Sequence, residues 1–261
     1  MSSDELLYAK DGHQAWITFN RPKVRNAVTW AMYSRLEEVC EEVDRDRDVR
    51  VVILRGAGGQ AFVAGTDISQ FADFRTEQDP LDYEARIDRI VGRLEHVSKP
   101  TVAMIEGYCV GGGAAIALAC DFRYATPALQ FGVPIAKTLG NCLSMANFAR
   151  LVDLLGPART KEVMMLARLL GAEECRQAGV INDIFPPESI EGEVRAVADT
   201  LAGMAPLTLR AVKEAVRRIQ AHRRIRPEDG EDLILSCYMS EDFREAVKAF
   251  TEKRRYQWQG R

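Results

Sequence analysis

The spacing of hydrophobic positions changes repeatedly along the first 186 residues of the chain. Short runs rich in β-branched and aromatic residues, at 14–20, 49–56 and 99–107, predict buried strands. Between the first two runs, apolar residues recur from Met32 to Val43 at the spacing of one helix face. This alternation of strands and helices predicts an α/β core.

The later part of the chain is dominated by helical spacing. Apolar residues at 145–155 predict a helix that stops at Gly156-Pro157, and residues 157–171 predict a second helix. After two prolines at 186–187 we expect helices over 188–204, 207–222 and 230–252. The chain therefore divides into a core of residues 1–186 and a helical region of residues 187–261, whose apolar faces must pack on the core or on another subunit.

Composition and charge exclude several classes of protein. The chain is 47% hydrophobic and 28% charged with a formal net charge of -3, which is ordinary for a globular protein and gives no basic field for nucleic acid. It lacks the ~18-residue apolar run that crosses a bilayer, and its first residues have no signal-peptide pattern, so we predict a cytoplasmic protein without nucleic-acid or membrane partners. The six cysteines form no C-x-x-C pair, and three scattered histidines give poor support to a zinc site or a Ser-His-Asp triad.

Three consecutive glycines, Gly111–Gly113, separate an apolar run from a short helix expected at residues 114–119. A phosphate-binding loop would need G-K-[ST] after its glycines, and a dinucleotide fingerprint would need glycine where Ile116 stands. The remaining functional interpretation is an oxyanion site, because glycines allow close approach of the backbone and a helix N-terminus has free N–H groups. Close packing in a tight turn would explain the glycines equally well.

A second run, "AFVAGTDISQF" at 61–71, changes that balance because it follows the strand at 49–55. Its small and flexible residues before Asp67 could present another exposed backbone N–H group. Two independent backbone donors, each at a strand end, would make a usable oxyanion hole.

Five segments together resemble the enoyl-CoA hydratase/isomerase (crotonase) superfamily. They occur in the family's order over nearly the whole chain: "NRPKVRNAVTW", "AFVAGTDI", "KPTVAMIEGYCVGGGAAIALACDFRYAT", "FGVP" and "EAVKAFTEKRRYQW". The resemblance implies a spiral of ββα units with C-terminal helices that form a homotrimer or a dimer of trimers. It also implies an acyl-CoA substrate with no separate cofactor, since coenzyme A is part of the substrate.

The resemblance also implies roles for individual residues. The oxyanion hole would consist of the N–H groups of Thr66 and Gly112. Coenzyme A would contact three groups of residues, namely Lys23, Val24 and Arg25 along its path, Ala64, Asp67 and Ile68 beside the adenine and pantetheine, and Lys253 with Arg254 near its phosphates.

Two carboxylates that the resemblance leads us to expect are missing. Hydratases of the family use one glutamate two residues after the last glycine and another directly after the proline, where this chain has Ala115 and Ile135. Asn141, seven positions after Pro134, stands where some family decarboxylases use a polar residue; it could orient a carboxylate or a water, or cap the following helix. Tyr238 lies in the region where some family lyases place a catalytic tyrosine.

These residues leave three functions open. The first is an enzyme of this family that acts on an acyl-CoA thioester through an enolate stabilised by the oxyanion hole, although it lacks both glutamates. The second is another reaction of the superfamily, such as decarboxylation or cleavage; loss of CO2 gives the enolate directly and needs only the hole. The third is a CoA-thioester-binding protein with little catalysis.

Overall fold

A six-stranded and a four-stranded sheet form the centre of the computed structural model, which describes residues 4–71 and 74–261, without the side chains of Ser69 and Gln70. The larger sheet has the order β1 (Leu6–Asp11), β2 (Gln14–Phe19), β3 (Val51–Gly56), β5 (Thr101–Ile105), β7 (Phe122–Ala125) and β10 (Asp183–Ile184). The smaller has the order β4 (Ala61–Val63), β6 (Tyr108–Val110), β8 (Gln130–Gly132) and β9 (Leu170–Gly171). Only the β1–β2 and β8–β9 pairs are antiparallel among the named pairs of the described chain.

The chain passes from the larger sheet to the smaller one three times. The strand pairs β3–β4, β5–β6 and β7–β8 each place one strand in each sheet, and a helix follows each pair. The helices of this part are α1 (Trp30–Arg45), α2 (Gln78–Glu95), α3 (Gly112–Ala119), α4 (Ile135–Thr138), α5 (Met145–Met165) and α6 (Ala172–Gln177). The result is a spiral of ββα units, which brings the ends of β4, β6 and β8 to one region.

The larger sheet is covered on both faces. On one face, α1, α2 and α3 bury apolar side chains in the main core, which includes Met32, Leu36 and Ile90. On the other face, α7 (Ile190–Gly203) packs its buried residues against β2, β3 and β5. Burial on both faces explains why β3 and β5 are continuous apolar runs rather than alternating ones.

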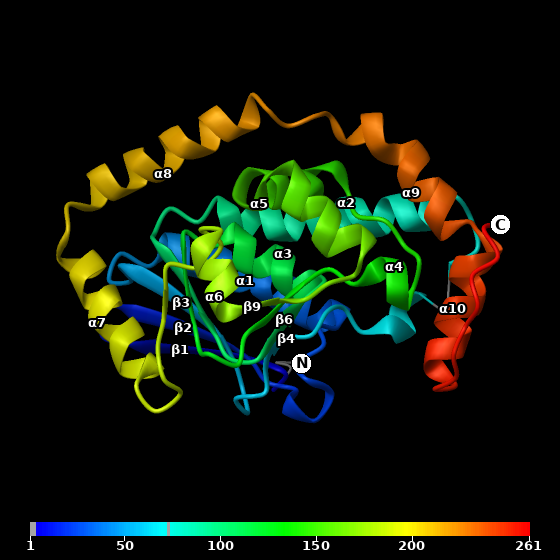
Figure 1. Ribbon diagram of the computed structural model, residues 1–261. Coiled ribbons are helices and arrows are strands. Elements are labelled where there is room, and N and C mark those ends of the chain that lie inside the picture. The colour runs from blue at the N-terminus through cyan, green and yellow to red at the C-terminus, as the bar shows by residue number, and fades with distance from the viewer. Residues whose placement is uncertain (1–3, 72–73) are drawn as a thin grey trace.

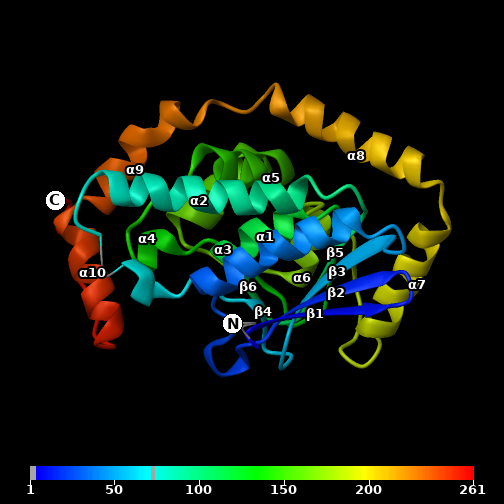
Figure 2. The same cartoon turned by 180° about the vertical axis from the view of Figure 1, so that it is seen from behind.

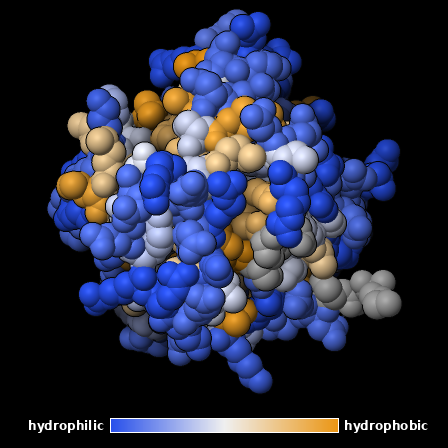
Figure 3. Space-filling model, turned by 90° about the vertical axis from the view of Figure 1, so that its right-hand side faces the viewer, coloured by the Kyte–Doolittle hydropathy of each residue, from blue (hydrophilic) through white to orange (hydrophobic). Residues whose placement is uncertain are grey.

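The C-terminal helices form an arch around this core (Figures 1 and 2). It consists of α7, α8 (Pro206–Ala221), α9 (Glu231–Tyr238) and α10 (Glu241–Thr251). Helix α8 has no buried residue and exposes Leu207, Val212, Val216 and Ile219, whereas α9 and α10 return to the core through Tyr238 and Phe243. The face that carries α10 is mostly hydrophilic, with hydrophobic residues grouped near its middle (Figure 3). No described helix combines the length and apolar character that a membrane span requires.

Most predicted elements are confirmed, and two helix boundaries are wrong. The strands at 14–20, 49–56 and 99–107 and the helix through Met32 and Val43 are present. The predicted stop at Gly156 is confirmed as a break, because Gly156 has a non-helical φ of 71° within the range Met145–Met165, but the helix after it ends at Met165 rather than at residue 171. The predicted helix 230–252 is divided between α9 and α10, because Ser240 caps the second helix. The division of the chain at residue 186 stays a prediction.

Candidate active site

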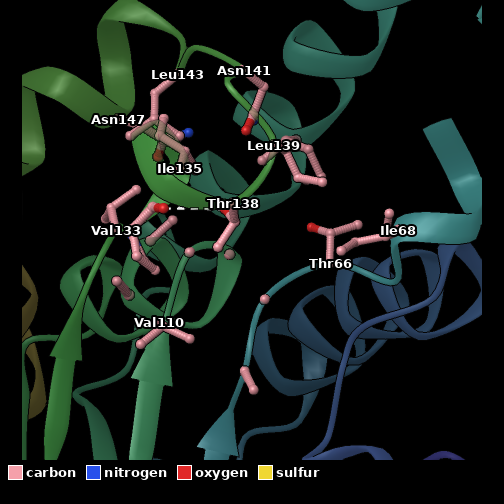
Figure 4. A pocket seen from close by; sticks show the side chains of 18 of the residues that line it. Thr66, Ile68, Val110, Val133, Ile135, Thr138, Leu139, Asn141, Leu143 and Asn147 are labelled. Carbon is pink, nitrogen blue, oxygen red and sulfur yellow. Dashed lines mark hydrogen bonds between the residues drawn. The ribbon is translucent and has the colours of Figure 1, made fainter. Parts of the chain in front are cut away.

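A cavity of about 200 Å³ lies where the smaller sheet meets α2, α3 and the segment after β8. Thr66 and Ile68 line one side of it, and Val133, Ile135 and Thr138 line the other (Figure 4). Phe250 of α10 also contributes to its wall. The cavity therefore joins the loop after β4, the start of α3 and the C-terminal arch within one chain.

The two residues predicted to supply an oxyanion hole come together at this cavity. A Cβ atom on Gly112 would lie 3.7 Å from the Thr66 nitrogen and only 2.6 Å from the Tyr33 hydroxyl. Gly112 is the first residue of α3, where a helix leaves its N–H groups without intrahelical acceptors. Throughout the described chain, no hydrogen bond uses the N–H of Thr66 or of Gly112. Two backbone donors are thus available side by side, next to a space that only glycine leaves open.

Two buried tyrosines hold the Thr66 side chain. The Tyr33 hydroxyl lies 3.0 Å from Thr66 Oγ1, and the Tyr83 hydroxyl donates to the same oxygen at 3.2 Å. Burial raises the pKa of both phenols, that of Tyr33 to about 12, so both remain neutral at ordinary pH. These contacts fix the loop that presents the Thr66 N–H group.

Most of the remaining wall of the cavity is apolar. Ala115 and Ile135, at the positions where the resemblance leads us to expect glutamates, both line the cavity. The other lining side chains include Val110, Leu118, Leu139 and Leu143. Among the described residues that line this cavity, none is lysine, arginine or histidine.

Asn141 lies in this wall and does not cap the next helix. Ser144 is the N-cap of α5, because its side chain accepts a hydrogen bond from the Asn147 N–H group at 3.3 Å. Asn141 Nδ2 instead donates to the Tyr238 hydroxyl at 3.1 Å. Its Oδ1 is buried and has no hydrogen-bond partner among the described residues. The capping interpretation of Asn141 is therefore wrong, and its role in orienting a carboxylate or a water stays a prediction.

The structure adds a carboxyl group that the sequence analysis missed, Glu84 of α2. Glu84 is only 3% exposed and lines the cavity. Its Oε1 accepts a hydrogen bond from the Tyr238 hydroxyl at 2.6 Å, and its Oε2 accepts one from the Ser144 N–H group at 3.0 Å. Burial, with a smaller contribution from the nearby Asp88 carboxylate, raises the pKa of Glu84 to about 8. One signal could have revealed it: Glu84 shares a helix face with the apolar Ile87 and Val91.

The residues predicted to contact coenzyme A have different surroundings. Ala64 and Ile68 line the cavity. Asp67 forms an ion pair with Arg21, with an O–N distance of 2.9 Å. Lys23, Val24 and Arg25 are exposed on the turn before α1, and the Arg25 guanidinium lies 4.6 Å from the centre of the Tyr108 ring. Lys253 is exposed beyond the end of α10 and does not line the cavity.

Three other polar residues near the motifs lack a place in the site. Asp121 accepts hydrogen bonds from the Thr101 N–H group at 2.8 Å and from Lys213 at 2.7 Å, as expected for a structural residue. Glu106 and Cys142 do not line the cavity, and a hydrogen bond with Cys237 together with burial raises the pKa of the Cys142 thiol. In residues 4–71 and 74–261 no three His, Cys, Asp or Glu side chains gather as a metal site would require.

Comparisons with known proteins find similar sequences and similar folds. The family model for enoyl-CoA hydratase/isomerase matches residues 11–261. The chain is 30% identical to a short-chain-enoyl-CoA hydratase of Clostridium acetobutylicum over 98% of this chain and 97% of that protein. It is 33% identical to a carnitinyl-CoA dehydratase of Escherichia coli over 99% and 100% of the two chains. The crystal structure of an enoyl-CoA hydratase/carnithine racemase from Magnetospirillum magneticum superposes with a TM-score of 0.81 at 29% identity, covering 100% and 97% of the two chains.

Proposed function

The chain belongs to the enoyl-CoA hydratase/isomerase family, and from this premise we propose that it is an enzyme that converts an acyl-CoA thioester through an enolate. The thioester carbonyl would accept hydrogen bonds from the N–H groups of Thr66 and Gly112. When a proton leaves C2 of the acyl group, negative charge moves onto this oxygen. Fixed donors that meet the developing charge lower the barrier, and losing one typically costs about 3 kcal/mol.

The observation that carries this proposal is the pair of unused backbone donors at one cavity. Thr66 follows β4 and Gly112 begins α3, so two separate segments place their N–H groups together. Simple packing would explain a glycine run, but not the adjacency of a second free donor. The apolar walls of the cavity would exclude water and strengthen both hydrogen bonds.

Classical hydration is the less favoured reaction of this site. Adding water across a double bond uses one group to activate the water and another to protonate carbon. Positions 115 and 135, where we expect the two hydratase glutamates, hold alanine and isoleucine. The site is therefore better suited to a reaction in which the acyl group loses and regains a proton, such as a double-bond shift.

Decarboxylation or cleavage of a charged acyl group is the second candidate reaction. It needs only the oxyanion hole, which favours it, and Asn141 could orient the departing carboxylate. The absence of any cation among the described lining residues argues against stable binding of such a carboxylate. We rank it below proton transfer on an uncharged chain for this reason.

The remainder of the coenzyme A molecule would extend along the surface outside the cavity. Lys23, Val24 and Arg25 would line its path, Ala64, Asp67 and Ile68 would lie beside the adenine and pantetheine, and Lys253 would reach a phosphate. We also propose a homotrimer or a dimer of trimers. The exposed apolar side chains of α8 support an assembly, because such a patch is unusual on a monomer.

The first test measures exchange and turnover on the same protein. Incubation with butyryl-CoA in D2O should give deuterium at C2, detected by mass spectrometry, and a 3-enoyl-CoA should isomerise faster than crotonyl-CoA is hydrated. Efficient hydration would contradict the assignment of positions 115 and 135. Tight binding without exchange or turnover would instead support a CoA-thioester-binding protein.

A further inference from the structure

The carboxyl group of Glu84 lies in the same cavity as the backbone donors of the oxyanion hole. Its neighbour in α2, Tyr83, donates to Thr66 Oγ1, so one short stretch of helix contacts the hole and presents the carboxyl group beside it. The other lining side chains on this part of α2 are apolar, including Ile87. A glutamate side chain is almost never fully buried unless it is paired with another group, so the presence of Glu84 in this cavity requires an explanation.

Two hydrogen bonds fix Glu84, and among the residues that the structure describes no cation forms an ion pair with it. Each of its oxygens accepts one hydrogen bond from a neutral group, the hydroxyl of Tyr238 or the N–H group of Ser144. Tyr238 is itself only 2% exposed and accepts a hydrogen bond from Asn141. The resulting chain from Asn141 through Tyr238 to Glu84 fixes the carboxyl group without forming an ion pair.

Such surroundings bring the titration of this carboxyl group close to neutral pH. Burial raises the pKa to about 8, Asp88 acts in the same direction, and the hydrogen bonds from Tyr238 and Ser144 oppose the shift. Both the acid and the carboxylate are therefore accessible near pH 7. This is the range in which a side chain can accept a proton from carbon and return it efficiently.

We propose that Glu84 is the catalytic proton-transfer residue of the site, and that Tyr238 and Asn141 are its positioning residues. This inference deepens the proposed function and rests on it. The substrate class is an uncharged unsaturated acyl-CoA, because a single carboxyl group can move a proton between two carbons but cannot also activate water.

The proton transfer balances without any other reactant. The Glu84 carboxylate takes the proton from C2 of a 3-enoyl thioester, and the electrons of the C–H bond form a dienolate whose oxygen is bound by Thr66 and Gly112. The resulting carboxylic acid gives the proton to C4, the C2–C3 double bond forms, and the carbonyl group is restored. Glu84 returns to its carboxylate form, and the product is the 2-enoyl thioester.

The decisive experiment compares Glu84→Gln with Glu106→Gln in the full-length protein. Glu106 is the control because it is a half-buried glutamate whose pKa is also raised by burial, but it does not line the cavity. Deuterium exchange at C2 of butyryl-CoA is measured in D2O, and binding of the same thioester is measured by calorimetry. We expect Glu84→Gln to slow exchange by about 10²–10⁴-fold while binding changes little, and Glu106→Gln to exchange like the wild type.

A second variant separates positioning from folding. Tyr238→Phe removes a hydrogen bond that stabilises the Glu84 carboxylate, so the pKa of Glu84 should rise further. The pH at which the exchange rate increases should therefore be higher than in the wild type. At pH 7 exchange should be roughly three- to tenfold slower. A merely structural role for Tyr238 would lower the amount of active protein without moving the pH profile.

The outcomes distinguish this inference from the proposed function. Exchange in Glu84→Gln at the wild-type rate would overturn the role of Glu84 and leave the enolate mechanism intact. A wild-type protein that binds butyryl-CoA without exchange would overturn both. An unchanged pH profile of exchange in Tyr238→Phe would show that Tyr238 does not position the Glu84 carboxyl group.

Discussion

The two walls of the cavity are built in different ways. On one wall, Thr66 and Gly112 present backbone N–H groups, and each belongs to a short motif that is visible in the sequence. On the other, Glu84 and Asn141 line the cavity, and both form hydrogen bonds with Tyr238 of α9, which lies behind them and does not line it. The first wall depends on local backbone geometry, and the second depends on segments that meet only in the folded protein.

The difference shows how one fold can serve several reactions. In the proposed mechanism, the backbone wall would stabilise the same oxyanion whatever the acyl group does next, so it would need no particular side chains. The side-chain wall would decide which proton moves, and a carboxylate from another helix could serve when the usual positions lack one. Ala115 and Ile135 at the expected positions, with Glu84 entering from α2, fit this account.

The largest expected effect is the pH dependence of the free energy of unfolding that Glu84, in the side-chain wall, contributes. In the unfolded chain Glu84 has a pKa of 4.5, whereas in the folded protein it is about 8. Between these values the folded state keeps a proton that the unfolded state has lost, so wild-type stability falls as the pH rises towards 8. This change would amount to about 5 kcal/mol at most, and Glu84→Gln should lack it.

Chemical denaturation at a series of pH values, at one protein concentration, measures this difference. The groups that face Glu84 also titrate or carry charge: Asp88 on its own helix, Cys142 before α5, Tyr238 on α9 and the neighbouring Tyr83. Burial keeps the two tyrosines neutral over this range, a hydrogen bond with Cys237 together with burial raises the pKa of Cys142 and keeps its thiol neutral, and all four groups remain in the variant. Parallel stability curves for the wild type and Glu84→Gln would show that Glu84 is already ionised at low pH in the folded protein.

The next effect concerns the backbone wall. A methyl group at Gly112 would lie 2.6 Å from the Tyr33 hydroxyl and 3.1 Å from Thr66 Oγ1, so Gly112→Ala must displace one side of the hole. We expect exchange at C2 to fall by about 10²–10³-fold, the cost of losing an oxyanion donor. Gly92→Ala is the control, because Gly92 lies inside α2 with open space around it.

The control should gain about 0.5–1 kcal/mol of stability and keep its exchange rate, since alanine favours a helix over glycine. Equal exchange in Gly112→Ala and the wild type would mean that the thioester oxygen does not lie at Gly112.

Sequence reasoning reached the backbone wall because its chemistry is local. Position 113 requires glycine because a Cβ atom there would lie 2.1 Å from the Val63 carbonyl oxygen. The start of α3 therefore packs closely on β4, and this packing is visible in the sequence as a run of glycines. The strands and α1 were likewise predictable from the period of their apolar residues. The family resemblance then fixed the order of the ββα units.

The side-chain wall was not predictable for a physical reason. Glu84 is separated from Asn141 and Tyr238 by long stretches of chain, and no short-range pattern records that α9 returns to α2. The break between α9 and α10 was missed because helical periodicity continues through Ser240, whose capping role depends on the turn before it.

The smallest expected effect separates the backbone of Thr66 from its side chain. Thr66→Val removes the hydroxyl that contacts Tyr33 and Tyr83 but keeps the N–H group, so exchange should stay within about threefold of the wild type. The two buried phenols lose their partner, which should lower the free energy of unfolding by about 1–3 kcal/mol. Thr66→Ser keeps the hydroxyl and should retain most of that stability. If Thr66→Val slowed exchange as much as Gly112→Ala, the threonine side chain rather than its backbone would be the group that acts on the thioester.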